Sequence, residues 1–157
     1  MIVADHIKKA TCNLDFLSNF YSSYNYNDWS VTVAFYTSLH IVEAAIYTKG
    51  KIKFNNQEHN LSDSETLKKW IEEGKVQKPD FFRNTTHEVR KTIVIENFGE
   101  ISQSYIALYN DSFTARYYKY FLQKWQIDLV VKPAISTILE WARKDFNFVF
   151  TTPFGKS

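Results

Sequence analysis

The sequence has few of the residues that define several protein classes. Its single cysteine, Cys12, excludes an internal disulfide and a cysteine-based metal cluster. With only 4 glycines and 3 prolines, it has little material for the turns of an all-β fold. No apolar run approaches the roughly 18 residues of a membrane span, and the start of the chain lacks a signal-peptide pattern. We therefore expect a cytoplasmic protein without a membrane contact.

Several catalytic motifs are also missing. The chain has no glycine-rich phosphate loop, no G-x-S-x-G and no His-Glu-x-x-His helix, so we expect neither a metal nor another cofactor. Its net charge of +2 is small. A strongly basic nucleic-acid binder is therefore disfavoured, although a local basic patch stays open.

Apolar and aromatic side chains are abundant. They make up 45% and 17% of the sequence, and a chain of 157 residues can bury a substantial core. The composition predicts a single all-α domain over residues 1–157. We expect an up-and-down bundle of about five or six helices, with a small pair of strands near the C-terminus.

The segment Asn27–Gly50 predicts a central, buried helix. Two stripes at helical spacing cover most of its circumference, and a helix that is apolar all round is buried. Asn27 or Asp28 is expected to cap its start, and Gly50 to end it. The first stripe comprises Val31, Phe35, Leu39, Val42 and Ile46; the second comprises Trp29, Val33, Tyr36, His40, Glu43 and Tyr47.

Four further helices are predicted around it. Apolar residues step by three and four from Val3 to Tyr21. Ser62 and Thr85 each begin a capping-box pattern, and the helix after Thr85 should end near Asn97. A long helix follows from Glu100 to about Leu122.

The end of the chain changes period. Pro133 fits the first turn of a last helix. Beyond it, Phe146, Phe148 and Phe150 alternate with other residues, which is typical of a strand. We predict that this tail pairs with a short strand at residues 52–54.

The candidate catalytic residues are His87, Arg90, Arg116, His40 and Glu43. His87 and Arg90 are three residues apart on one helix, as are His40 and Glu43, so each pair shares a face. Histidine suits proton transfer near neutral pH, and the arginine fork suits phosphate. A histidine beside an arginine is the minimum for metal-independent RNA cleavage by the ribose 2′-hydroxyl. Arg90, Arg116, Lys49 and Lys51 are the candidate RNA- or phosphate-binding residues.

Each candidate also has a purely structural interpretation. His40 with Glu43 is typical of a polar pair that holds core helices in register. Arg116 lies among tyrosines, as a stacking or ion-pair residue would. Lys49 and Lys51 are typical of a solvated loop. His6 has no supporting sequence context.

Three segments together resemble a bacterial branch of the HEPN superfamily. They are D-W-S-V-T-V-A-F-Y-T-S-L-H-I-V-E-A, then T-H-E-V-R, then S-Y-I-A-L-Y-N-D-S-F-T-A-R-Y, within residues 28–117. The resemblance implies an α-helical bundle that is commonly a homodimer. It also implies a polar cluster of His40, Glu43, His87, Arg90 and Arg116 with Tyr117 where three helices meet.

Two main functions follow as hypotheses, beside the binding of a nucleotide or another small anion by the same polar cluster. Many members of this family are RNA-cleaving toxins or defence effectors, so the first is an RNA-directed protein, a metal-independent endoribonuclease. The second is a non-catalytic module that dimerises or regulates the product of a neighbouring gene, such as an antitoxin or nucleotidyltransferase. Active members typically carry Arg, four to six residues and then His, whereas only three residues separate Arg83 from His87 here.

Overall fold

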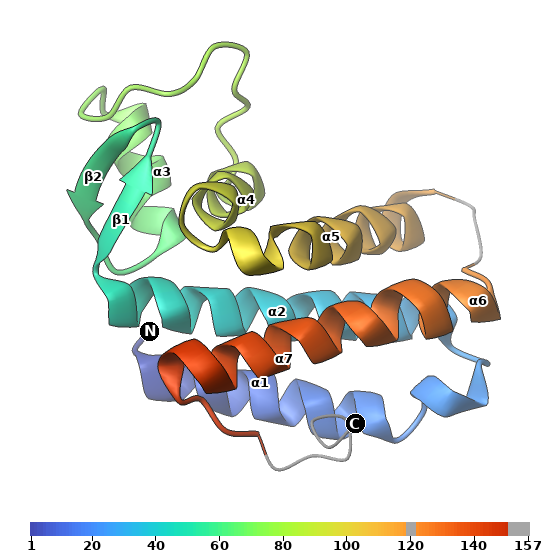
Figure 1. Ribbon diagram of the computed structural model, residues 1–157. Coiled ribbons are helices and arrows are strands. Elements are labelled where there is room, and N and C mark those ends of the chain that lie inside the picture. Colours follow the sequence, from blue (N-terminus) through green and yellow to red (C-terminus); the bar gives the residue numbers. More distant parts are fainter. Residues whose placement is uncertain (119–121, 151–157) are drawn as a thin grey trace.

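The computed structural model, described for residues 1–118 and 122–150, is a helical bundle built around one central helix (Figure 1). The central helix α2 (Asn27–Lys49) is flanked by α1 (Val3–Ser18), α5 (Ser102–Tyr117) and α7 (Lys132–Phe146). The predicted all-α bundle is therefore confirmed. Its other elements are α3 (Ser64–Glu72), α4 (Thr86–Asn97), the short α6 (Lys124–Gln126), a π-helical segment (Ile127–Val131) and one-turn helices at Tyr21–Ser23 and Gly99–Ile101.

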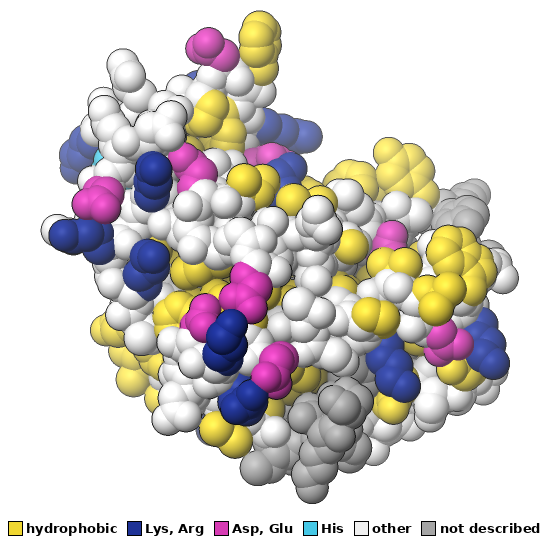
Figure 2. Space-filling model, in the orientation of Figure 1, with side chains coloured by type: hydrophobic (Ala, Val, Ile, Leu, Met, Phe, Trp, Pro, Cys, Tyr) yellow, Lys and Arg dark blue, Asp and Glu magenta, His cyan; other side chains and the backbone are white. Residues whose placement is uncertain are grey.

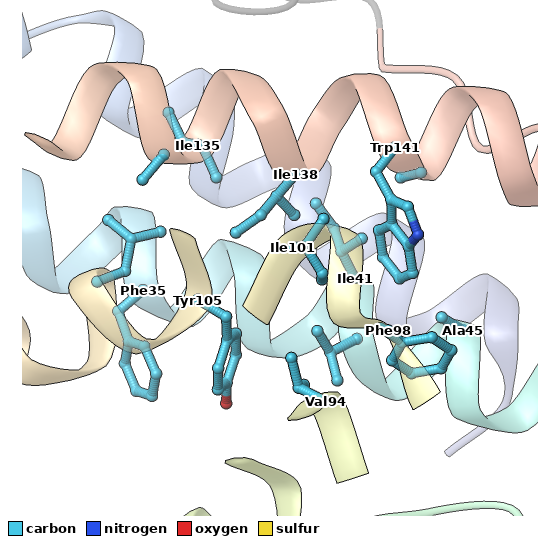
Figure 3. Close-up of a cluster of buried hydrophobic side chains, with 14 of the residues drawn as sticks. Phe35, Ile41, Ala45, Val94, Phe98, Ile101, Tyr105, Ile135, Ile138 and Trp141 are labelled. Atoms are coloured by element: carbon cyan, nitrogen blue, oxygen red, sulfur yellow. The ribbon is translucent and has the colours of Figure 1, made fainter. Parts of the chain in front are cut away.

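Part of the core lies between α2, α4, α5 and α7, as Figure 3 shows, and α1 contributes Ala10, Leu14 and Leu17 to the same core. Helix α2 is long and apolar enough to cross a membrane, but 78% of its most apolar 18-residue window is buried within this chain. Other helices therefore cover its apolar surface. The labelled core side chains are Phe35, Ile41, Ala45, Val94, Phe98, Ile101, Tyr105, Ile135, Ile138 and Trp141.

Some helix ends follow the sequence prediction and others do not. Thr85 caps α4 by accepting a hydrogen bond from the Glu88 amide at 3.2 Å. Helix α3 is capped by Asp63, which accepts from the Thr66 amide at 2.7 Å, and not by Ser62. Gly50 ends α2 with a φ of 70°, a conformation that glycine adopts without strain.

The predicted cap of α2 is wrong. Tyr26 occupies the N-cap position and makes no capping hydrogen bond with its side chain. Asn27 instead donates to the Leu122 carbonyl at 2.9 Å, and Asp28 accepts from the Leu122 amide at 3.1 Å. The Asp28 carboxylate thus accepts from a distant amide and not from the first turn of its own helix.

The small strand pair exists, but its predicted location is wrong. Strand β1 (Lys51–Phe54) pairs in antiparallel fashion with β2 (Gln57–Asn60), and not with the C-terminal tail. Asn55 and Asn56 both have positive φ, as a tight two-residue hairpin turn requires. The hairpin forms because such a turn closes a far shorter loop than pairing with the tail would.

The tail is irregular up to residue 150 and packs by its aromatic rings. Phe146 contacts Trp141 with ring centroids 5.1 Å apart, and Phe148 stacks on Phe146 at 5.4 Å. Residues 151–157 lie outside the described part of the chain. Helix α5 ends at Tyr117, earlier than predicted, and α7 has Pro133 in its first turn as expected.

Candidate functional site

A buried ion pair joins α2 to α4. The Arg90 Nε donates to Glu43 Oε1 at 2.7 Å, and the two residues are only 6% and 4% exposed. The second carboxylate oxygen of Glu43 accepts from the Ser64 amide at the start of α3 at 3.2 Å. Glu43 therefore ties three helices together and neutralises Arg90.

The surroundings of this ion pair disfavour phosphate binding at Arg90. A cavity of about 610 Å³ lies beside it, and Asp63, Glu65 and Glu72 are among its lining residues. Among the lining residues these carboxylates outnumber Lys69, so they repel a polyanion. Arg90 is buried and paired with Glu43, and phosphate binding by Arg90 stays a prediction.

His87 contacts Arg90 and two aromatic rings. The Arg90 Nη1 lies 3.3 Å from His87 Nδ1. Because a guanidinium has no acceptor, Nδ1 must accept, and the proton of the neutral ring is assigned to Nε2. Burial and the positive charges of Arg90 and Arg116 lower the pKa of His87. The ring is therefore mostly neutral near pH 7.

Arg116, near the end of α5, is an unneutralised cation among aromatic rings. It donates to the Tyr36 hydroxyl at 3.1 Å and to the Ser112 carbonyl at 3.2 Å. Its Cζ lies 5.8 Å from the Phe35 ring centroid and 5.3 Å from that of Tyr117. No carboxylate of the described residues forms an ion pair with it.

His87 and Arg116 meet at the ring of Phe35. The His87 ring lies 5.7 Å from that ring and 5.8 Å from the ring of Tyr109. Phe35 is fully buried, whereas Tyr36, His87, Tyr109 and Arg116 are partly exposed. Lys91 also lies beside this group, with its Nζ 5.5 Å from the centroid of Tyr109, and its charge is paired with Glu88 at 2.9 Å. We call this group the Phe35 site: Phe35, Tyr36, His87, Lys91, Tyr109 and Arg116.

His40 points to a different partner from the one its spacing suggested. Its Nδ1 lies 3.1 Å from the Nδ1 of His6 on α1, and the two rings are 5.4 Å apart. One nitrogen must donate and the other accept, so the pair is stable when it shares one proton. The signal for His6 was its position four residues before the buried Ala10, on the stripe that continues to Leu14.

This histidine pair predicts loss of stability in acid. Burial, followed by the neighbouring His6, lowers the pKa of His40 to about 4, and burial also lowers that of His6. Lys9 and Arg90 act in the same direction, and Glu43 opposes them. The unfolded chain therefore binds more protons than the folded one between pH 6.5 and 4, so stability falls as pH decreases across that range.

The effect of His40 should be measurable by denaturation in urea at several pH values. Because the His40 ring is partly exposed and screened by solvent, its lowered pKa changes the free energy of unfolding by about 1–2 kcal/mol between pH 6.5 and 4. His40→Gln is expected to flatten this part of the pH profile. His59→Gln, on β2, is the matched control. An unchanged profile in His40→Gln would contradict the assignment.

Lys49 and Lys51 do not join the Phe35 site. Both are exposed, at the end of α2 and the start of β1. Lys49 lies about 20 Å further along α2 than Tyr36, from a rise of about 1.5 Å per residue. The two lysines and Arg116 therefore do not form one phosphate-binding surface. On the face shown in Figure 2, basic and acidic side chains are interspersed.

Among the described residues, no group of three or more His, Cys, Asp or Glu side chains is arranged to hold a metal ion. The residues of the Phe35 site that the sequence missed are Phe35, Tyr36, Lys91 and Tyr109. Phe35 and Tyr36 were expected only as stripe residues, because their contacts come from other helices. Comparisons with family models, curated proteins and solved structures find no match to this chain.

Proposed function

We propose that this protein is an HEPN-like RNA-directed protein and that the Phe35 site cleaves RNA without a metal ion. The observation that carries the proposal is the convergence of His87 and Arg116 on one buried ring, with Arg116 not neutralised by a described carboxylate. A fixed guanidinium suits a phosphate, and a histidine beside it suits proton transfer. The sequence resemblance to RNA-cleaving families supports the same substrate.

The chemistry is a transesterification within the RNA. The ribose 2′-oxygen attacks the phosphorus and the bond to the 5′-oxygen breaks. Water takes the 2′-hydroxyl proton, and His87 gives a proton to the leaving oxygen. Arg116 stabilises the negative charge of the pentacovalent phosphate. The products are a 2′,3′-cyclic phosphate and a 5′-hydroxyl.

The remaining predicted residues support this site. Glu43 neutralises Arg90, whose Nη1 donates to Nδ1 of the neutral His87 ring. Uptake of a proton at Nδ1 breaks this hydrogen bond, so Arg90 orients the ring only in its neutral form. His40 binds His6 and has no part in proton transfer. Because only the imidazolium form of His87 gives up a proton readily, the rate should rise as pH falls below 6.5, the ordinary pKa of histidine.

The test is RNA cleavage in a chelator. His87→Ala is expected to reduce the rate by about 10²–10⁴-fold, which is typical of a lost general acid. Arg116→Ala should cost about 10²–10³-fold, as for one lost electrostatic donor. His59→Ala and Arg83→Ala are matched controls outside the site and should retain activity. Cleavage that survives His87→Ala would overturn the assignment.

A second candidate is a non-catalytic interaction module that dimerises or regulates a neighbouring enzyme. One observation favours it: His40, the other imidazole of the predicted set, is bonded to His6 and so supplies no second acid–base group beside His87. Purification from the native host distinguishes the two. A stoichiometric protein partner with no cleavage of RNA would favour the module.

A further inference from the structure

A furrow runs between α1 and α2 and ends in an aromatic pocket. Its cavity measures about 940 Å³, and α1 contributes Lys8, Lys9 and Asn13 to its lining while α2 contributes Trp29 and Tyr36. Trp29 also lines a second pocket of about 260 Å³, together with Phe16, Phe20 and Tyr26. Trp29 lines both hollows, and we call them together the α1–α2 furrow.

The aromatic end of the furrow is unusually exposed. Trp29, Tyr26 and Phe16 are 63%, 57% and 56% exposed, although large aromatic side chains are normally buried. The Phe16 and Phe20 rings meet edge to face, with their centroids 4.9 Å apart. In this arrangement the two rings do not cover each other's faces. Such a patch marks a binding surface.

The α1 wall of the furrow carries Lys8 and Lys9 together with one carboxylate, Asp5, which leaves it with a net positive charge. Lys8 and Lys9 are exposed on α1, and neither forms an ion pair with a described carboxylate. Lysines beside exposed rings match the repeating chemistry of single-stranded nucleic acid, in which phosphates alternate with bases that have free faces. A duplex keeps its bases stacked and does not offer them to such rings.

The furrow also leads to the Phe35 site. Tyr36 lines the furrow, and its hydroxyl accepts the hydrogen bond from Arg116. Trp29 lies about 10 Å from Tyr36 along α2, from a rise of about 1.5 Å per residue. A strand whose base stacks on Trp29 can therefore extend its backbone along α2 toward Arg116.

We infer that the α1–α2 furrow binds single-stranded RNA, with bases stacked on Trp29 and its aromatic neighbours and phosphates beside Lys8 and Lys9. This inference rests on the proposed function and extends it, because it names the strand form of the substrate and its path to the Phe35 site. The partner is a flexible, unpaired strand, and the contacts of the furrow carry little base specificity.

The test is fluorescence anisotropy with a labelled oligouridine whose 2′-hydroxyls are methylated, so that it cannot be cleaved. Trp29→Ala is expected to raise Kd by about tenfold or more, and Trp29→Phe to restore most of the affinity. Replacing both Lys8 and Lys9 with alanine should reduce the slope of log Kd against log salt by about 1.4, from about 0.7 per phosphate contact of a single strand. Phe81→Ala and Lys78→Ala, in the exposed loop before α4, are matched controls.

The outcomes separate this inference from the proposed function. If the wild type binds and cleaves RNA while the Trp29 and lysine variants bind like it, the furrow is not the path of the strand. Equal affinity for a duplex of the same length would also overturn the inference. If the wild type neither binds nor cleaves RNA, the proposed function itself fails, and the exposed rings are left for a protein partner.

Discussion

Replacing Glu43 with alanine is expected to lower the free energy of unfolding by about 3–5 kcal/mol, the usual cost of removing one partner of a buried ion pair. The reason is the charge left behind: the Arg90 guanidinium, only 6% exposed, would lose its carboxylate at 2.7 Å. The Ser64 amide would lose its acceptor as well. Urea denaturation followed by circular dichroism measures the change.

A double-mutant cycle gives this prediction its control. Glu43→Leu and Arg90→Leu should each be strongly destabilising, whereas the double variant should be less destabilised than the sum of the two, because no charge stays buried alone. Glu72→Ala, which removes an exposed partner of Lys68, should have a much smaller effect. Additive losses in the double variant would show that the two side chains do not interact.

Replacing Phe35 with alanine is expected to cost about 3–5 kcal/mol, because it removes a fully buried ring and leaves a cavity. The loss should extend to the site. Phe35 contacts the rings of Tyr105 and Tyr109 at 5.9 Å and 5.7 Å, in addition to His87 and Arg116. Denaturation in urea measures the free energy of unfolding, and the rate of RNA cleavage in chelator reports on the Phe35 site.

Phe35→Leu separates these two roles. Leucine fills most of the space, so we expect a loss of only about 1–1.5 kcal/mol. Leucine has no ring on which the Arg116 guanidinium can lie. The rate of RNA cleavage should therefore fall clearly even though the variant stays folded. Phe113→Ala, on α5 and 40% exposed, is the control for a less buried ring. Wild-type cleavage by a folded Phe35→Leu variant would show that the ring does not position Arg116.

Local sequence signals predicted many of the helices. Apolar spacing identified the buried face of α1, because a helix buries the face on which its apolar residues repeat. It also identified α2 as the central helix, because a helix that is apolar all round is buried. Thr85 predicted the start of α4, and Pro133 the first turn of α7, since both act through the backbone nearest to them. The strand at Lys51–Phe54 was also expected.

The failures are contacts between distant segments. Phe146 and Phe148 alternate as a strand would, but packing on Trp141 competes successfully with pairing. Asp28 has the right chemistry for a cap, yet the Leu122 amide takes its carboxylate. In both cases the local pattern allowed two outcomes, and the free energy of a contact far along the chain selected one.

The sequence by itself determined the helical class, the central helix and the residue types that a phosphate site would need. Only the tertiary structure decided how those residues are paired. Helical spacing places His40 beside Glu43, but it does not tell which residues of the neighbouring helices they contact. Glu43 meets Arg90 on α4, and His40 meets His6 on α1. Buried charged and polar groups need hydrogen-bond partners, and these two contacts supply them. His87 and Arg116 are then the two predicted residues that lie together at Phe35.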